Sequence, residues 1–142
     1  MVDKKLAKEV RKMYERSKIK EDPQNILKFL EITKQLAVED EELKEVLETE
    51  KITGQWVLTD RDFAWWLSAG DGVFDYGLGE ADDPSFTMKA NWDLMGDILS
   101  MEVDGTDAFM AGDLVIEGDL QVVTEIYGEI TRVAIEAMQR FS

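Results

Sequence analysis

Carboxylates are the main candidates for chemistry in this sequence. The 142 residues include no histidine and no cysteine, which excludes a thiolate zinc site, a haem imidazole ligand, a Ser-His-Asp triad and a cysteine nucleophile. Acidic residues are abundant, but many fall in expected turns, where an aspartate usually bonds its own backbone. These are Asp71, Asp75, Asp82, Asp83, Asp104, Asp107 and Asp113.

None of these acids follows a metal-binding or catalytic pattern. No segment matches the Asp-x-Asp-x-Asp-Gly calcium loop with its distant Glu, and no acid pair is fixed at a defined separation. The segment 77–82 resembles a phosphate-binding glycine loop, but it lacks the third glycine, and Pro84 and Ser85 lead into an expected strand. We therefore predict no metal, no cofactor and no catalytic residues, so that the protein is not an enzyme.

Charge separates the first twenty residues from the rest of the chain. The net charge is -15, and residues 1–20 hold eight basic and three acidic residues, which gives +5 there and leaves -20 elsewhere. So acidic a body repels phosphates and argues against nucleic-acid binding. The basic segment has two interpretations. It folds back and partly neutralises the acidic body, or it makes transient contact with anionic lipid headgroups.

The composition is that of one globular domain. Hydrophobic residues make up 44% and charged residues 33%, and the length is sufficient for a sizeable core. No apolar run approaches the ~20 residues of a membrane span, and the lysine-rich start lacks a signal-peptide core. We therefore expect a cytoplasmic protein.

The spacing of apolar residues changes near residue 50. Helical spacing predicts helices over 3–17, from Asp22 and Pro23, and from Asp40. Alternating spacing then predicts an antiparallel meander of four strands, in which Gly70 to Gly72 form a tight hairpin. A helix capped by Asn91, a helical turn capped by Asp104, a fifth strand and a final helix from Leu120 follow. The predicted strands cover 52–59, 63–68, 73–78, 85–90 and 114–116.

The stretch from Phe109 to Leu120 joins the last of these elements. Gly112 ends a helix, the run from Leu114 to Ile116 is typical of a strand, Gly118 permits a sharp turn, and Asp119 is suited to cap the final helix. The expected order is helix end, strand, glycine turn and helix.

This pattern resembles the sterol carrier protein 2 (SCP2-like) family of lipid-binding domains, and the resemblance covers about residues 50 to 138. It implies an α+β fold with a curved, mostly antiparallel five-stranded sheet covered by helices. It also implies an apolar ligand tunnel between sheet and helices and no chemistry of its own. Residues 1–48 would then be an N-terminal helical extension packed on a core of residues 49–142, as a cap or an oligomerisation surface.

Aromatic and methionine side chains would line that tunnel. Four Trp, six Phe and seven Met residues suit an apolar pocket, although such residues also fill ordinary cores. In a sheet, one of Trp65 and Trp66 must point away from the core, and we expect an N-terminal helix to cover Trp66. The expected ligand-binding residues are Trp65, Leu67, Phe86, Met88, Met95, Leu99, Phe109, Met110, Ile126 and Ile130.

The expected function is non-catalytic intracellular carriage of a long apolar ligand. Fatty acid, acyl-CoA, phospholipid, quinone and sterol-like molecules all remain candidates. The alternative is a protein-interaction or enzyme-accessory domain of the same fold without a tunnel. The oligomeric state is left open, a homodimer included.

Overall fold

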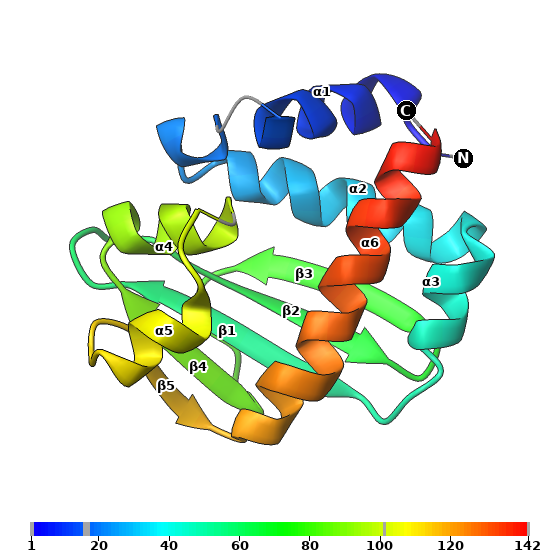
Figure 1. Ribbon diagram of the computed structural model, residues 1–142. Coiled ribbons are helices and arrows are strands. Elements are labelled where there is room, and N and C mark those ends of the chain that lie inside the picture. Colours follow the sequence, from blue (N-terminus) through cyan, green and yellow to red (C-terminus); the bar gives the residue numbers. More distant parts are fainter. Residues whose placement is uncertain (1, 16–17, 101, 142) are drawn as a thin grey trace.

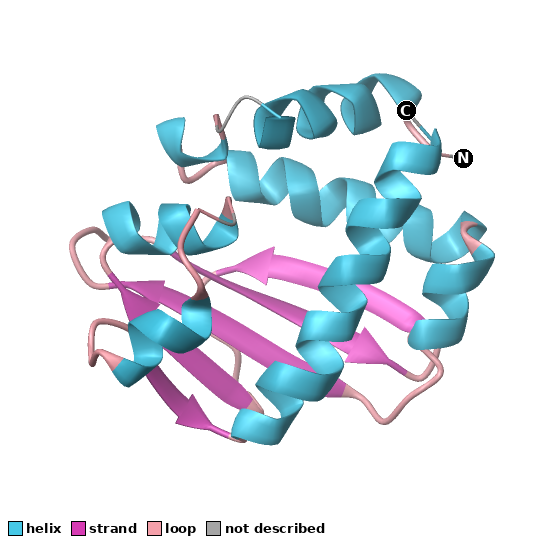
Figure 2. Ribbon diagram, viewed as in Figure 1, coloured by secondary structure: helices cyan, strands magenta, loops and turns pink. Residues whose placement is uncertain are grey.

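A five-stranded sheet forms the floor of the molecule, and helices cover one of its faces (Figures 1 and 2). The computed structural model describes residues 2–15, 18–100 and 102–141. The strand order is β3-β2-β1-β4-β5. The strands are β1 (Ile52–Leu58), β2 (Ala64–Gly70), β3 (Val73–Leu78), β4 (Phe86–Ala90) and β5 (Val115–Gly118).

The sheet is mixed, because β4 pairs with β1 in parallel while the other three pairings are antiparallel. The mostly antiparallel five-stranded sheet and the α+β class are confirmed, but the meander is wrong for its fourth strand. The loop after β3 crosses the sheet instead of turning back. The Ala81 amide donates to Gln55 Oε1 (2.8 Å) and the Ser85 amide donates to the Thr53 carbonyl (2.7 Å), which delivers the chain to the far side of β1.

The two faces of the sheet differ in what covers them. Trp56 and Trp65 stack at 5.9 Å with nearly parallel rings on the face that the helices cover. Trp66, paired with Gln55 in the register, lies on the opposite face. It packs on β3, where a Cβ at Gly77 would lie 2.7 Å from the indole ring. The N-terminal helices lie on the other side of the sheet (Figure 1), so the expectation that one of them covers Trp66 is wrong.

Three helices begin at the caps that the sequence predicts, but α2 begins at Asn25, two residues after the expected start at Pro23, and no side chain caps it. Asp40 accepts from the Leu43 amide and Asn91 from the Leu94 amide, while Asp104 accepts from the Thr106 amide. The predicted end of the first helix at residue 17 lies outside the described residues. The helical elements are α1 (Lys4–Glu15), η1 (Ile19–Glu21), α2 (Asn25–Glu39), α3 (Glu41–Val46), α4 (Trp92–Leu99), α5 (Gly105–Met110), η2 (Val122–Tyr127) and α6 (Gly128–Phe141).

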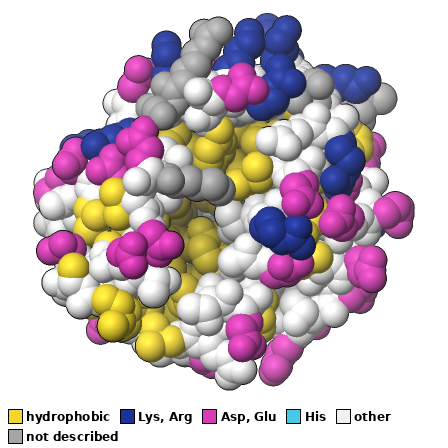
Figure 3. Space-filling view, in the orientation of Figure 1, with side chains coloured by type: hydrophobic (Ala, Val, Ile, Leu, Met, Phe, Trp, Pro, Cys, Tyr) yellow, Lys and Arg dark blue, Asp and Glu magenta, His cyan; other side chains and the backbone are white. Residues whose placement is uncertain are grey.

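The basic segment does fold back on the acidic body. Lys20 pairs with Asp93 and Asp97 of α4, each at 2.8 Å. Lys20 belongs to η1, whereas four lysines of α1 stay exposed, and dark blue side chains gather over α1 at the top of the molecule in Figure 3. Contact with anionic lipid headgroups therefore stays a prediction, which vesicle co-sedimentation at low and high salt would test. The four lysines are Lys4, Lys5, Lys8 and Lys12.

Candidate ligand-binding site

An apolar cavity of about 470 Å³ lies between the sheet and the helices. Figure 3 shows a hollow lined by hydrophobic side chains between α6 and the segment that holds α4 and α5. Strands β2 and β3 provide the floor, α1 and α2 one wall, α4 a second, and η2 with α6 the cover. The lining residues are Tyr14, Ile26, Phe29, Leu30, Thr33, Trp65, Leu67, Phe74, Ile98, Leu99, Tyr127, Gly128, Ile130, Thr131, Arg132, Ala134, Ile135, Glu136 and Gln139.

A cluster of aromatic rings closes the cavity at the base of η2. Trp56 meets Phe86 edge-on at 5.6 Å, and Tyr127 lies 5.2 Å from Trp56 and 5.8 Å from Phe86 between ring centroids. Phe86 has room only because residue 54 is a glycine, where a Cβ would lie 2.4 Å from its ring. Offset and edge-to-face arrangements of this kind are favoured between aromatic rings, and through Tyr127 they connect η2 to the sheet.

Four of the ten expected ligand-binding residues line the cavity, namely Trp65, Leu67, Leu99 and Ile130. Phe86, Met88 and Met95 are buried in the packed core, and Phe109 and Ile126 pack against it half-buried. Met110 is 78% exposed, because it ends the short helix α5 on its outer side. The structure thus brings together the two expected residues of β2 and one residue each of α4 and α6, but not the two of β4 or the pair Phe109 and Met110.

Sequence reasoning missed the wall that α1 and α2 provide. Ile26, Phe29, Leu30 and Thr33 share one face of α2, and this face lines the cavity. Their spacing in the sequence predicts an apolar face on a helix, but such a face fits an ordinary packed core as well as a cavity wall. The missing information was that this face meets β2 across an open space.

Two half-buried phenol groups, those of Tyr14 and Tyr127, line the cavity. Burial raises the pKa of Tyr14, and the nearby Tyr127 raises it further. Burial also raises the pKa of Tyr127, while a side-chain hydrogen bond with Thr131 opposes that shift. Both hydroxyls therefore keep their protons at neutral pH and are able to donate hydrogen bonds. Thr33 is already satisfied, since its hydroxyl donates to the Phe29 carbonyl (2.8 Å).

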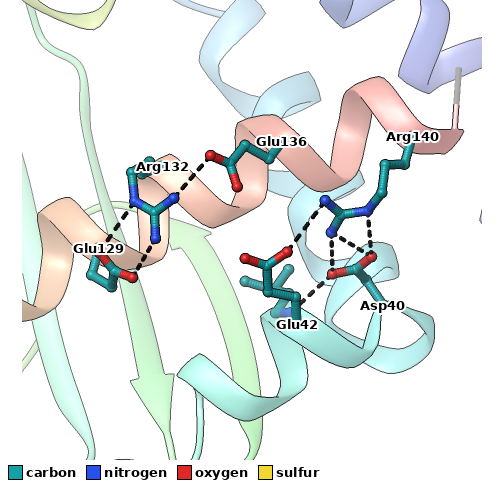
Figure 4. Close-up of polar contacts among 7 residues, drawn as sticks. Asp40, Glu42, Glu129, Arg132, Glu136 and Arg140 are labelled. Atoms are coloured by element: carbon teal, nitrogen blue, oxygen red, sulfur yellow. Dashed lines mark hydrogen bonds and ion pairs between the residues drawn. The ribbon is translucent and has the colours of Figure 1, made fainter.

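A charged cluster borders the cavity on α6. Arg132 Nη1 lies 2.8 Å from Glu136 Oε1, and the same guanidinium also binds Glu129 (Figure 4). The hydrogen bond from Arg132 lowers the pKa of Glu129. Arg132 is therefore occupied by two carboxylates of its own helix.

A second ion-pair cluster fixes the far end of α6. Arg140 Nη2 lies 2.8 Å from both carboxylate oxygens of Asp40, and Arg140 Nη1 lies 3.3 Å from Glu42 Oε2 (Figure 4). The Asp40 side chain is only 6% exposed, and it also caps α3. This contact ties the C-terminal end of the cover to the junction of α2 and α3.

Within the described parts of the chain, no helix is long and apolar enough to cross a bilayer. The same residues contain no group of three acidic side chains placed to hold a metal ion. The site is a largely apolar space whose polar lining residues are Tyr14, Thr33, Tyr127, Thr131, Arg132, Glu136 and Gln139.

The fold and the cavity together define a helix-covered α+β domain with an apolar site. The model of the SCP-2 sterol transfer family matches residues 29–128, and the chain belongs to this family. The match begins inside α2, and thus includes part of the wall that the sequence reasoning assigned to an extension. A search of the curated proteins finds no match.

Solved structures share the fold at low sequence identity. Sterol carrier protein 2 from Yarrowia lipolytica has a TM-score of 0.56 at 14% identity, and the match covers 72% of this chain and 86% of that one. The UbiJ-SCP2 ubiquinone synthesis protein has a TM-score of 0.54 at 16% identity, with 73% and 85% covered. The stereoselective inverting sec-alkylsulfatase Pisa1 from Pseudomonas sp. has a TM-score of 0.52 at 21% identity. The match covers 60% of this chain but only 14% of that enzyme.

Proposed function

We propose that the protein binds a long apolar molecule in the cavity between the sheet and helices α2, α4 and α6, and carries it without chemical change. The observation that supports this most is the cavity itself, with a volume of about 470 Å³ and a largely apolar lining. Pockets of this size and character are typical of small-molecule sites. Membership of a sterol transfer family supports a lipid-like ligand.

Apolar burial alone supplies enough binding energy. Each methylene moved from water into the cavity contributes about 0.8 kcal/mol, so roughly 12 methylenes give about 10 kcal/mol before the ordering costs of binding. Fatty acid, acyl-CoA, phospholipid and sterol-like molecules remain candidates. The likeness to a ubiquinone synthesis protein keeps quinones among them. Since the chain has no cysteine for a disulfide, the cytoplasm remains the proposed location.

The likeness to the alkylsulfatase supports a second candidate. There a domain of this fold is a small part of an enzyme, so the present chain would serve as an accessory domain that presents an apolar substrate to a separate catalytic protein. This candidate predicts the same cavity and ligand binding, but also activity that requires a second protein.

Native mass spectrometry of the freshly purified protein tests the proposed function. We expect a stoichiometric adduct of lipid mass, which solvent extraction would release for identification. Ile135→Trp should fill the cavity from α6 and reduce the adduct at least about tenfold, since binding needs the open volume. Met110→Trp is the matched control, because it adds the same ring at an exposed position outside the cavity, and it should bind like the wild type.

A clean mass that stays clean after incubation with fatty acids, acyl-CoA and quinones would contradict ligand binding. It would favour the alternative of a protein-interaction domain. Thermal unfolding of both variants separates loss of the cavity from loss of the fold.

A further inference from the structure

The Tyr14 hydroxyl is an unused hydrogen-bond donor on the cavity. Tyr14 lies in the last turn of α1, and its ring meets Phe29 of α2 at 5.6 Å, edge to face. The side chain lines the cavity, and its hydroxyl has no hydrogen-bond partner among the residues that the structure describes. Tyr14 is half-buried, so solvent reaches its hydroxyl when no ligand is bound. A ligand that displaced this solvent would leave the donor unpaired, which is costly, unless the ligand supplied an acceptor.

The second phenol lies within electrostatic range of the first. Tyr127 comes from the opposite side of the cavity, at the base of the cover, and influences the charge state of Tyr14. Burial keeps both groups protonated. The two phenols, which come from opposite walls of the cavity, are close enough to influence each other, and both present a proton and not a negative charge.

We propose that the buried end of the ligand carries an uncharged hydrogen-bond acceptor, such as a ketone, quinone or ester oxygen, which accepts from the Tyr14 hydroxyl. This inference rests on the proposed function and narrows its ligand class. It places a neutral polar group beside Tyr14 and Tyr127 and apolar chain along β2 and α2.

The charged residues of the cavity lining disfavour a carboxylate beside Tyr14. Of the described residues that line the cavity, Arg132 and Glu136 are the only charged ones, and they pair with each other. A carboxylate beside Tyr14 would therefore meet no unpaired cation among the lining residues, which makes its burial costly.

A carboxylate at the border of the cavity meets a similar obstacle. Arg132, Glu129 and Glu136 together hold one positive and two negative charges. An anionic head placed there would have to displace a carboxylate that already holds the guanidinium. The site therefore disfavours an anionic head at either end and selects a neutral molecule.

Three probes of similar chain length separate these cases. Competition against a fluorescent apolar probe at pH 7.4 would compare 2-heptadecanone, which has a neutral acceptor, with palmitate, which is anionic, and heptadecane, which has no acceptor. We expect the wild type to bind the ketone about fivefold tighter than the alkane, the range of one hydrogen bond, and to bind palmitate more weakly than the ketone.

Tyr14→Phe is the decisive variant, because it removes only the hydroxyl. It should abolish the preference for the ketone and leave the affinity for the alkane unchanged. Tyr76→Phe is the matched control, since the Tyr76 hydroxyl donates to Glu31 (2.7 Å) and Tyr76 does not line the cavity. It should bind all three probes like the wild type.

Equal competition by ketone and alkane in the wild type, or stronger competition by palmitate, would overturn this inference and leave apolar binding intact. A Tyr14→Phe variant that keeps the ketone preference would do the same. Failure of the fluorescent probe and of all three competitors to bind would overturn the proposed function itself, and the inference with it.

Discussion

The two ends of the C-terminal helical segment are held in different ways. Residues 133–141 bury four side chains in the core and end in the ion pair between Arg140 and Asp40. Residues 119–127 bury none completely, and Leu120 is 44% exposed. The cover of the cavity is therefore fixed at its C-terminal end and lightly held at its N-terminal end. The four buried residues are Val133, Ala134, Ala137 and Met138.

The lightly held end also departs from regular helix geometry. Residues 122–127 form a π-helix, where the sequence predicts an uninterrupted α-helix from Leu120. A π-helix is rare in proteins, and those that occur often lie at functional sites. Tyr127 ends this turn and lies against the aromatic cluster. We expect opening at η2 to expose the cavity while the buried half of α6 stays in place.

Removing the ion pair between Asp40 and Arg140 should have the largest effect on the free energy of unfolding. Asp40→Ala deletes a buried carboxylate that both caps α3 and binds Arg140. We expect a loss of about 3 kcal/mol in the free energy of unfolding, from the lost cap and the lost charged hydrogen bonds together. Urea unfolding measures it.

Glu42→Ala is the control for that substitution. Glu42 binds the same Arg140, but its side chain is about half exposed, so its loss should cost less than about 1 kcal/mol. Equal losses in the two variants would show that the C-terminal end is not held by the buried carboxylate.

Amide hydrogen exchange tests the other half of the comparison. The amides of residues 122–127 should exchange at least about tenfold faster than those of residues 133–138, because segments with few buried contacts open at low free energy. A bound apolar ligand should slow exchange at η2 more than in the buried half of α6. Uniform protection along both stretches would remove the distinction between the two ends.

The elements of the fold were accessible to sequence reasoning because their signals are local. Alternation marks the strands, and the caps at Asp40, Asn91, Asp104 and Asp119 mark helix starts. Which strand pairs with β4 does not follow from the local sequence. The segment 79–85 can span roughly 23 Å when extended, enough to cross the ~14 Å of three strand spacings, so its length permits either a return to β3 or a crossing to β1.

The candidate site was less accessible for a related reason. The alternating pattern places Trp65 and Leu67 on the covered face of the sheet, and both line the cavity. Phe86 lies on the same face, but it packs against Tyr127 and does not line the cavity. Which inward residues border an open space depends on how helices from distant parts of the chain fit together. For this reason the sequence predicts only a helical extension over α1 and α2, whereas Tyr14 and Phe29 line the cavity.

The smallest expected effect concerns the charged cluster between the two ends of the cover. Arg132 lowers the pKa of Glu129, so this pair contributes stability above the unfolded pKa of about 4.3, and the contribution is lost as the pH falls through the folded value. Both side chains are about half exposed, so the gain is small. Arg132→Gln should raise the pKa of Glu129 toward 4.3 in an NMR titration, whereas Glu136→Gln should keep it low. If Arg132→Gln leaves the pKa of Glu129 unchanged, the ion pair between the two side chains does not form in solution.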